Sequence, residues 1–268
     1  MKDKVVIITG GSSGIGYALA EAFGANGSKI MITGRKQEAL DEATNKLEAK
    51  GIEVISFQSD VSKEEDNQKM AEAAVKHFGR IDILINNAGI SMRALFSELD
   101  LSVVKRVMDI NFYGALYATK YCLSEIEKNQ GSVVGISSIA GYRGLPARTG
   151  YSASKFALQG FLEVLRTEML KKNVHVLTAC PGFTASNIRK SSLTADGSHQ
   201  GDSPRKEEKM MTAEECANHI YKATKKRKKF LTLTTQGKLT VFLNKWIPGF
   251  MDKVVYNVMA KEENSPFK

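Results

Sequence analysis

Tyr151 and Lys155 are the residues of this 268-residue chain whose types and spacing best suit acid–base chemistry. They open and close the run Tyr-Ser-Ala-Ser-Lys, and residues four apart on a helix share one face. A neighbouring cation favours the phenolate and lowers the pKa of a tyrosine from its usual value of about 10. We therefore predict Tyr151 as a general acid or base assisted by Lys155. An exposed helical pair of the same spacing is the structural alternative.

A glycine-rich turn near the N-terminus has the composition of a phosphate-binding site. Thr9–Gly16 reads Thr-Gly-Gly-Ser-Ser-Gly-Ile-Gly, between an apolar run and a helix-compatible segment. Glycines at 10, 14 and 16 let the backbone turn sharply and approach a pyrophosphate, which the N–H groups at a helix N-terminus attract. A plain strand-to-helix turn is the alternative, but the flanking pattern favours a dinucleotide.

The next strand-to-helix junction bears on which dinucleotide binds. An acid that would bond the adenosine ribose is expected at the end of the second strand in NAD-selective folds, and Gly34 stands there instead. Arg35 offers a fork of donors to a 2′-phosphate. We predict NADP(H) rather than NAD(H). In the alternative, Arg35 and Lys36 are only the solvated start of a helix.

Short β-branched runs alternate with longer amphipathic stretches along the chain, which indicates strands alternating with helices. This pattern predicts an α/β fold of the Rossmann type: a doubly wound, three-layer sandwich around a parallel seven-stranded sheet. We expect strands near Val5–Thr9, Ile30–Thr33, Val54–Gln58, Ile81–Ile85, Ser132–Ile136, Val174–Ala179 and Phe230–Thr234. We expect helices near Ile15–Ala25, Gln37–Ala49, Glu64–Phe78, Leu101–Lys128, Ser152–Leu170 and Ala213–Thr224. Residues 1–268 form one domain, because no linker divides the chain.

Five motifs in order along the chain resemble the short-chain dehydrogenase/reductase family. They are Thr-Gly-x-x-x-Gly-x-Gly at 9–16, Asn-Asn-Ala-Gly at 86–89, Gly-Ile-Ser-Ser-Ile-Ala-Gly at 135–141, the Tyr-x-x-x-Lys motif at 151–155, and Pro-Gly at 181–182. The resemblance covers nearly the whole chain. It implies an oxidoreductase that interconverts a secondary alcohol and a ketone with a nicotinamide cofactor.

The resemblance also implies a role for each matching residue. Tyr151 exchanges the substrate proton, Lys155 also holds the nicotinamide ribose, Ser138 bonds the substrate oxygen, and Asn111 links Lys155 through water to solvent. The implied cofactor-binding residues are Gly10, Ser12, Ser13, Gly14, Ile15, Gly16, Arg35, Asp60, Val61, Asn87, Ala88, Gly89, Tyr151, Lys155, Pro181, Gly182, Thr184 and Ser186. No metal site is expected.

Composition limits the remaining possibilities. The formal net charge is +9, and residues 183–268 hold 16 Lys and Arg against 9 Asp and Glu, so most of the excess lies in the C-terminal third. No nucleic-acid motif accompanies this charge, so nucleic acid is not an expected partner. Three cysteines without ligand spacing favour a reducing compartment. The apolar run Val5–Ile8 is too short for a secretion signal, and we expect a cytoplasmic protein.

The C-terminal third contains three unusual segments. Residues 183–211 are rich in Ser, Gly, Lys and Asp and suit a substrate loop. Lys225–Lys229 is basic throughout; it suits either a helix end or an anion-binding surface. Residues 237–260 form an amphipathic segment with the only tryptophan, Trp246. This segment could close the core, cover the substrate, or contact a membrane surface peripherally.

Parts of all three segments refine the resemblance. Ser192–His199, the lysine-rich helix end at Lys225–Lys229 and Trp246–Phe250 resemble the member 7B branch of the dehydrogenase/reductases. That branch implies a lipophilic, lipid- or steroid-like substrate and relatives that often associate with membranes. The family also implies a homodimer or homotetramer. Two alternatives remain open: reduction of 3-oxoacyl groups on an acyl carrier protein, for which a basic surface is suited, and a nucleotide-binding sensor without turnover.

Overall fold

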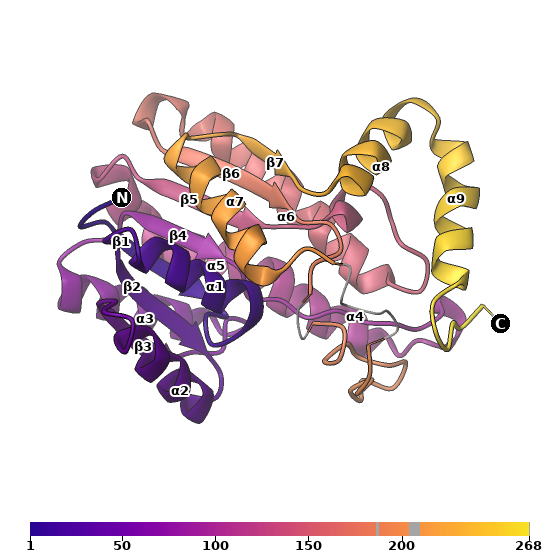
Figure 1. The fold of residues 1–268 in the computed structure, drawn as a ribbon, viewed down its shortest axis with the longest axis horizontal. Helices are drawn as coiled ribbons and strands as arrows, with labels where there is room; N and C mark the ends of the chain where they lie inside the picture. Colours follow the sequence, from indigo (N-terminus) through magenta and orange to yellow (C-terminus); the bar gives the residue numbers. More distant parts are fainter. Residues whose placement is uncertain (186–187, 204–209, 268) are drawn as a thin grey trace.

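A seven-stranded parallel sheet forms the middle layer of the protein (Figure 1). The structure is a computed structural model that describes residues 1–185, 188–203 and 210–267. Neighbouring strands follow the order β3-β2-β1-β4-β5-β6-β7, and all pairs are parallel. The strands are β1 Val5–Thr9, β2 Lys29–Gly34, β3 Val54–Gln58, β4 Ile83–Asn86, β5 Ser132–Ile136, β6 His175–Cys180 and β7 Phe230–Thr232. The predicted doubly wound sheet is confirmed.

Helices cover both faces of this sheet. One apolar core joins the strands to α1, α2 and α7, through side chains such as Phe23, Leu40 and Ile220. The second core joins the opposite face to α3, α5 and α6, through Met70 and Leu162 among others. The helices are α1 Gly14–Gly24, α2 Gln37–Glu48, α3 Glu64–Phe78, α4 Leu101–Met108, α5 Gly114–Lys128, α6 Thr149–Glu168, α7 Ala213–Lys225, α8 Thr235–Trp246 and α9 Pro248–Ala260.

The predicted single helix over Leu101–Lys128 is wrong in one respect. A π-helical turn, Asp109–Tyr113, separates α4 from α5. Such turns insert an extra residue into a helix and occur at functional sites, where they redirect a side chain. Periodicity does not reveal this interruption, because the apolar pattern continues through it. A second difference is that α6 begins at Thr149, so Tyr151 lies in its first turn.

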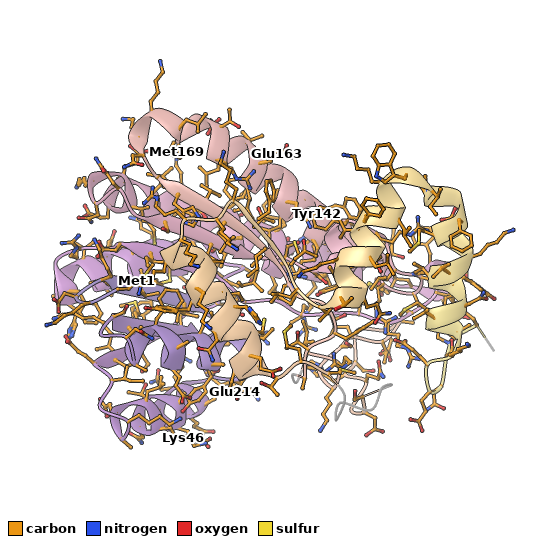
Figure 2. All side chains as sticks on the ribbon, turned by 45° about the horizontal axis from the view of Figure 1, so that its top comes forward. Met1, Lys46, Tyr142, Glu163, Met169 and Glu214 are labelled. Atoms are coloured by element: carbon orange, nitrogen blue, oxygen red, sulfur yellow. The ribbon has the colours of Figure 1, made fainter. Side chains whose placement is uncertain are left out.

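Two short helices, α8 and α9, form a hairpin beside the carboxyl ends of the strands (Figures 1 and 2). Pro248 occupies the first turn of α9, where its fixed φ and missing N–H are tolerated, and so marks the break between the helices. Met251, Val255 and Met259 recur every four residues and form a small buried cluster of their own. None of the described helices combines the length and apolar character needed to cross a bilayer.

The carboxylate of Asp82 joins the chain's N-terminal residues to the sheet. It accepts hydrogen bonds from Lys4 Nζ at 2.8 Å, from Arg80 Nη2 at 2.6 Å and from the Val5 amide at 3.0 Å, and its side chain is 1% exposed. Burial alone would raise the pKa of Asp82, but the bonds from Arg80, Lys4 and Val5 outweigh burial and hold the pKa below its usual value.

Because the folded protein holds Asp82 at a lowered pKa, its contribution to stability should be complete above the unfolded-state pKa and be lost as pH falls through the folded pKa. We expect Asp82→Asn to lower the free energy of unfolding by about 2 kcal/mol at neutral pH. Urea unfolding should show this difference shrinking in acid. Asp41→Asn, at an exposed site on α2, is the control and should have little effect. Equal stability of Asp82→Asn and the unaltered protein at neutral pH would contradict the prediction.

Candidate active site

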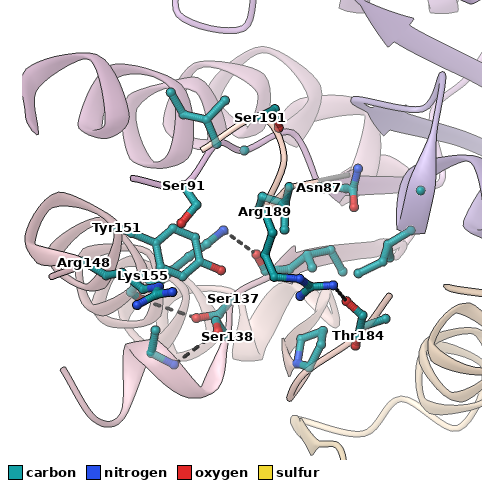
Figure 3. A pocket seen from close by; sticks show the side chains of 18 of the residues that line it. Asn87, Ser91, Ser137, Ser138, Arg148, Tyr151, Lys155, Thr184, Arg189 and Ser191 are labelled. Atoms are coloured by element: carbon teal, nitrogen blue, oxygen red, sulfur yellow. Dashed lines mark hydrogen bonds between the residues drawn. The ribbon is translucent and has the colours of Figure 1, made fainter. Parts of the chain in front are cut away.

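The candidate site is a cavity of about 580 Å³ at the carboxyl ends of the parallel strands (Figure 3). Ligands of open α/β sheets bind in this crevice, because the loops leaving the strands converge there. Its lining includes every predicted cofactor-binding residue that the structure describes, together with Ser138. Ser186 lies outside the described residues. The remaining predicted catalytic residue, Asn111, is buried close to the cavity but is not part of its lining.

The glycine-rich turn between β1 and α1 has the shape of a phosphate cradle. Gly10 and Gly14 adopt φ values of +65° and +55°, which favour glycine. A Cβ on Gly16 would lie 2.1 Å from the carbonyl oxygen of Gly10, so α1 can approach the turn this closely only without a side chain there. Asn87 Nδ2 donates to the carbonyl oxygens of Thr9 and Gly10 at 2.9 and 3.1 Å. These bonds fix the turn to the end of β4, and the cradle fits a dinucleotide phosphate.

The predicted adenosine end of the cavity is open and bears a positive charge. Arg35 is exposed and lines the cavity next to Gly34. A Cβ at Gly34 would meet nothing closer than Leu40 Cδ2 at 3.5 Å, which is ordinary contact. Packing therefore does not require glycine at position 34. Asp60 and Val61, also predicted to bind the cofactor, line the same cavity.

Tyr151, Lys155 and Ser138 meet at the other end of the cavity (Figure 3). Lys155 Nζ lies 5.7 Å from the centre of the Tyr151 ring and donates a hydrogen bond to the Ile136 carbonyl oxygen at 2.9 Å. The Ser138 hydroxyl accepts a hydrogen bond from the Ala140 amide at 3.2 Å and acts to lower the pKa of Tyr151. The sequence prediction that these three side chains share one site agrees with this geometry.

The sequence analysis expected a lowered pKa for Tyr151, and this expectation is wrong for the protein without bound cofactor. Burial raises the pKa of Tyr151, and the opposing effects of Ser138, Arg148 and Arg189 are smaller. Burial also lowers the pKa of Lys155 to about 8. The sequence reasoning counted the cation but not the loss of solvent around both groups. Tyr151 is consequently a protonated donor at neutral pH.

Asn111 connects two parts of the site through the π-helical turn. Its Nδ2 donates to the Ile90 carbonyl oxygen and to Ser154 Oγ, both at 2.9 Å, and its Oδ1 accepts from the Ile90 amide at 2.8 Å. A Cβ on Gly89 would lie 3.2 Å from Asn111 Oδ1 and 3.5 Å from Lys155 Nζ, so both side chains approach the same glycine. Asn111 therefore clamps the loop after β4 to α6.

A buried ion pair brings the C-terminus to the site, and the sequence analysis missed it. Arg148, three residues before Tyr151, donates to both Glu262 oxygens at 3.1 and 2.8 Å, and Glu262 is 2% exposed. Arg93 Nε approaches the same carboxylate at 3.5 Å. More than a hundred residues separate Arg148 from Glu262, so no local spacing signals the contact. The sequence analysis also missed Ser154, which accepts a hydrogen bond from Asn111. Its place inside the Tyr-Ser-Ala-Ser-Lys motif is the only sequence signal that could have pointed to it.

Apolar side chains of α9 form a wall of the cavity that the sequence analysis did not assign residue by residue. The side chains are Met251, Val254, Val255, Val258 and Met259. Arg189 lies opposite Tyr151 and donates to the Thr184 carbonyl oxygen at 2.8 Å (Figure 3). The cavity therefore combines a glycine cradle, a proton donor and an apolar wall.

Comparison with known proteins places this geometry in a family. The family model of short chain dehydrogenase matches residues 4–197. Dehydrogenase/reductase SDR family member 7B of Mus musculus is 34% identical over 273 residues, which cover 99% of this chain and 84% of that protein. The 11-beta-hydroxysteroid dehydrogenase A of Arachis hypogaea is 34% identical over 257 residues, 93% of this chain and 73% of its own length.

A solved structure supports the fold independently. The short chain dehydrogenase/reductase from Burkholderia phymatum in complex with NAD superposes with a TM-score of 0.83 at 24% sequence identity, covering 93% of this chain and 95% of that one. The sequence matches and the sheet agree with the motif-based resemblance. This chain is a dehydrogenase or reductase acting on CH–OH groups, and it belongs to the short chain dehydrogenase family.

Proposed function

We propose that this protein interconverts a ketone and a secondary alcohol on an apolar substrate with NADP(H), using Tyr151 as general acid and base. The observation that carries the proposal is one cavity in which the glycine cradle, Tyr151 and the apolar wall of α9 meet. A bound nicotinamide cofactor would supply or accept the hydride. The residues that fit it are those of the cradle, Arg35 and Lys155.

The proton step follows from the positions of three side chains. In reduction, the Tyr151 hydroxyl donates its proton to the carbonyl oxygen, and the Ser138 hydroxyl holds that oxygen in place by hydrogen bonding. Charged Lys155 stabilises the phenolate that Tyr151 becomes. Asn111 holds α6 against the loop after β4, and so helps to fix the position of Lys155, which also lies on α6. In oxidation the same groups act in reverse.

The preference for NADP(H) is supported by two neighbouring positions. Gly34 lacks the acid that would bond ribose hydroxyls, and the space beside it is not needed for packing. Arg35 lines the cavity there and can form paired, charge-assisted hydrogen bonds with a 2′-phosphate.

An apolar substrate is supported by α9. Its five methionine and valine side chains would exclude water from a lipophilic ketone, as a pocket for such a ligand requires. The carrier-protein alternative has less support, because Lys225–Lys229 precedes β7 and therefore lies at the amino ends of the strands, away from the cavity. Family membership disfavours the sensor alternative.

A homodimer or homotetramer is proposed on the outer faces of α5 and α6. Phe156 and Val164 of α6 are 47% and 58% exposed, and Tyr113 just before α5 is 42% exposed. Large apolar side chains gathered on packed helices are typical of subunit contacts.

Replacing the proposed proton donor gives the first test of this mechanism. We expect Tyr151→Phe to lower kcat for reduction of lipophilic ketones by on the order of 10² to 10⁴ while NADPH still binds, because only the hydroxyl is lost. Tyr142→Phe is the matched control, since Tyr142 is half-buried and its hydroxyl neighbours Cys180 rather than Ser138. Turnover that survives in Tyr151→Phe would exclude this role.

The pH profile tests the part played by Lys155. The pKa of Lys155 is about 8, so the amine is charged below that pH and neutral above it. We expect kcat/KM for ketone reduction to fall as pH rises through this value, because the phenolate loses its stabilising cation. Steady-state rates across the alkaline range at fixed ionic strength measure this. A profile that stays level well above the pKa of Lys155 would disagree.

Cofactor preference can be tested at positions 34 and 35. We expect Arg35→Ala to raise KM for NADPH by about tenfold and to leave KM for NADH within about twofold, because only NADPH carries the 2′-phosphate. Gly34→Asp should shift preference toward NADH. Lys46→Ala, at the far end of α2, is the control for lost surface charge. Equal effects of Arg35→Ala on both cofactors would refute the assignment.

The apolar wall can be tested by filling it. We expect Val258→Phe to raise KM for bulky hydroxysteroid-like substrates by about tenfold while small ketones are little affected, because the added ring occupies cavity volume. Asn257→Phe adds the same bulk to the exposed neighbouring position. Parallel losses for small and bulky substrates would instead indicate damage to the whole site.

A further inference from the structure

The α8–α9 hairpin exposes several large apolar side chains. Leu239, Phe242, Trp246, Ile247 and Phe250 are 54%, 62%, 67%, 44% and 58% exposed, and we call these five the hairpin surface. The first three are spaced three and four residues apart on α8, so they share one helix face. Ile247 and Phe250 continue the surface around the turn into α9.

This exposure belongs to a hairpin that is packed firmly by its other side. Met251 and Val255 are 2% and 6% exposed and face the cavity. Asn244 Nδ2 donates to the Tyr142 carbonyl oxygen at 3.0 Å, and Asp252 pairs with Arg143. These contacts hold the inner side of the hairpin against the rest of the protein, so its outer side faces solvent in this structure.

The two helices of the hairpin also carry exposed positive charge. Lys238, Lys245 and Lys253 are exposed on the two helices, and Lys245 Nζ lies 5.6 Å from the Trp246 ring centre. Asp252, the one acidic side chain of the hairpin helices, is paired with Arg143. The hairpin thus combines exposed aromatic and aliphatic groups with three lysines for which the described residues show no ion pair.

We propose that the hairpin surface docks on a lipid bilayer that carries anionic headgroups. Short helices with aromatic residues on one face and lysines beside them lie in the interfacial layer, where the apolar groups leave water and the lysines meet lipid phosphates. Tryptophan favours that layer, since its ring is apolar and its N–H is polar. The hairpin stands out at one end of the molecule, so it can reach a flat surface (Figure 1).

The composition of the hairpin surface favours lipid over a second copy of the chain. Three exposed lysines on the same two helices would repel those of an identical partner, whereas they would attract anionic lipid headgroups. The helices α5 and α6 offer a separate apolar face for self-association that does not include the hairpin. Docking would also place α9, whose inner face lines the cavity, against the medium that dissolves lipophilic molecules.

Trp246 makes the proposal directly measurable, because it is the only tryptophan in the chain. The full-length protein is mixed with vesicles of phosphatidylcholine alone or with added phosphatidylserine. On the anionic vesicles we expect co-sedimentation, a blue shift of Trp246 emission, protection from iodide, and quenching by lipids brominated on their acyl chains. Binding to the neutral vesicles should be weaker.

Three variants test whether vesicle binding depends on the hairpin surface, on basic residues elsewhere, or on other exposed apolar side chains. Phe242→Ser with Phe250→Ser retains Trp246 as the probe and should lower the partition onto anionic vesicles by at least about tenfold. Neutralising Lys225, Lys226, Lys228 and Lys229 to Gln should leave most binding intact, because these residues lie at the opposite edge of the sheet. Phe96→Ser with Leu170→Ser removes equally exposed apolar groups elsewhere.

Three results would overturn the proposal. The first is the absence of any shift or co-sedimentation with anionic vesicles, for protein that binds NADPH and has the expected helical signal. The second is binding that survives Phe242→Ser with Phe250→Ser but is lost in the lysine variant. The third is a hairpin variant that changes only the oligomeric mass measured by light scattering, which would assign the surface to a second copy. Ketone turnover is measured separately, so loss of lipid binding and loss of the proposed reaction are distinguishable.

Discussion

The parallel arrangement of the strands is the constraint from which the rest of this structure follows. Every strand must be reached by a crossover, so all seven end at the same edge, and both faces of the sheet must be covered by helices. The loops that leave β1, β4, β5 and β6 therefore converge on one crevice. That convergence brings Gly10, Asn87, Ser138 and Pro181 into the same cavity, although they are distributed over more than 170 residues. The strands themselves contribute little chemistry; they fix where the loops begin.

Burial then determines what the converging groups can do. Solvent exclusion raises the pKa of Tyr151 and lowers that of Lys155, so a proton donor and a titratable cation lie side by side at neutral pH. Such a site depends on rigid supports. The Asn111 clamp holds α6 against the loop after β4. The Arg148–Glu262 pair joins the segment after α9 to the start of α6, the helix that carries Tyr151. Loss of either partner of a buried ion pair leaves an uncompensated buried charge, which destabilises the surrounding structure. Removing Arg148 or Glu262 would therefore disturb the part of the cavity that they line.

The two sides of the C-terminal hairpin have different surroundings. One side of α9 closes the cavity with methionine and valine, whereas α8 and the turn present aromatic groups and lysines to solvent. The basic run Lys225–Lys229 is separated from both, at the amino ends of the strands. The positive excess of the C-terminal third therefore comprises at least two surfaces with different surroundings. Net charge alone does not distinguish them.

Sequence and tertiary structure determine different features of this protein. The sequence by itself determined the strand order along the chain, the glycine cradle, and the pairing of Tyr151 with Lys155, because each depends on local spacing or on ordered motifs. Tertiary structure decided the π-helical turn that aims Asn111, the direction of the Tyr151 pKa shift, and the contact between Arg148 and Glu262. These features depend on desolvation and on contacts between distant segments. Desolvation and distant contacts have no local signal in the chain, since they arise only when the chain folds and its layers exclude water.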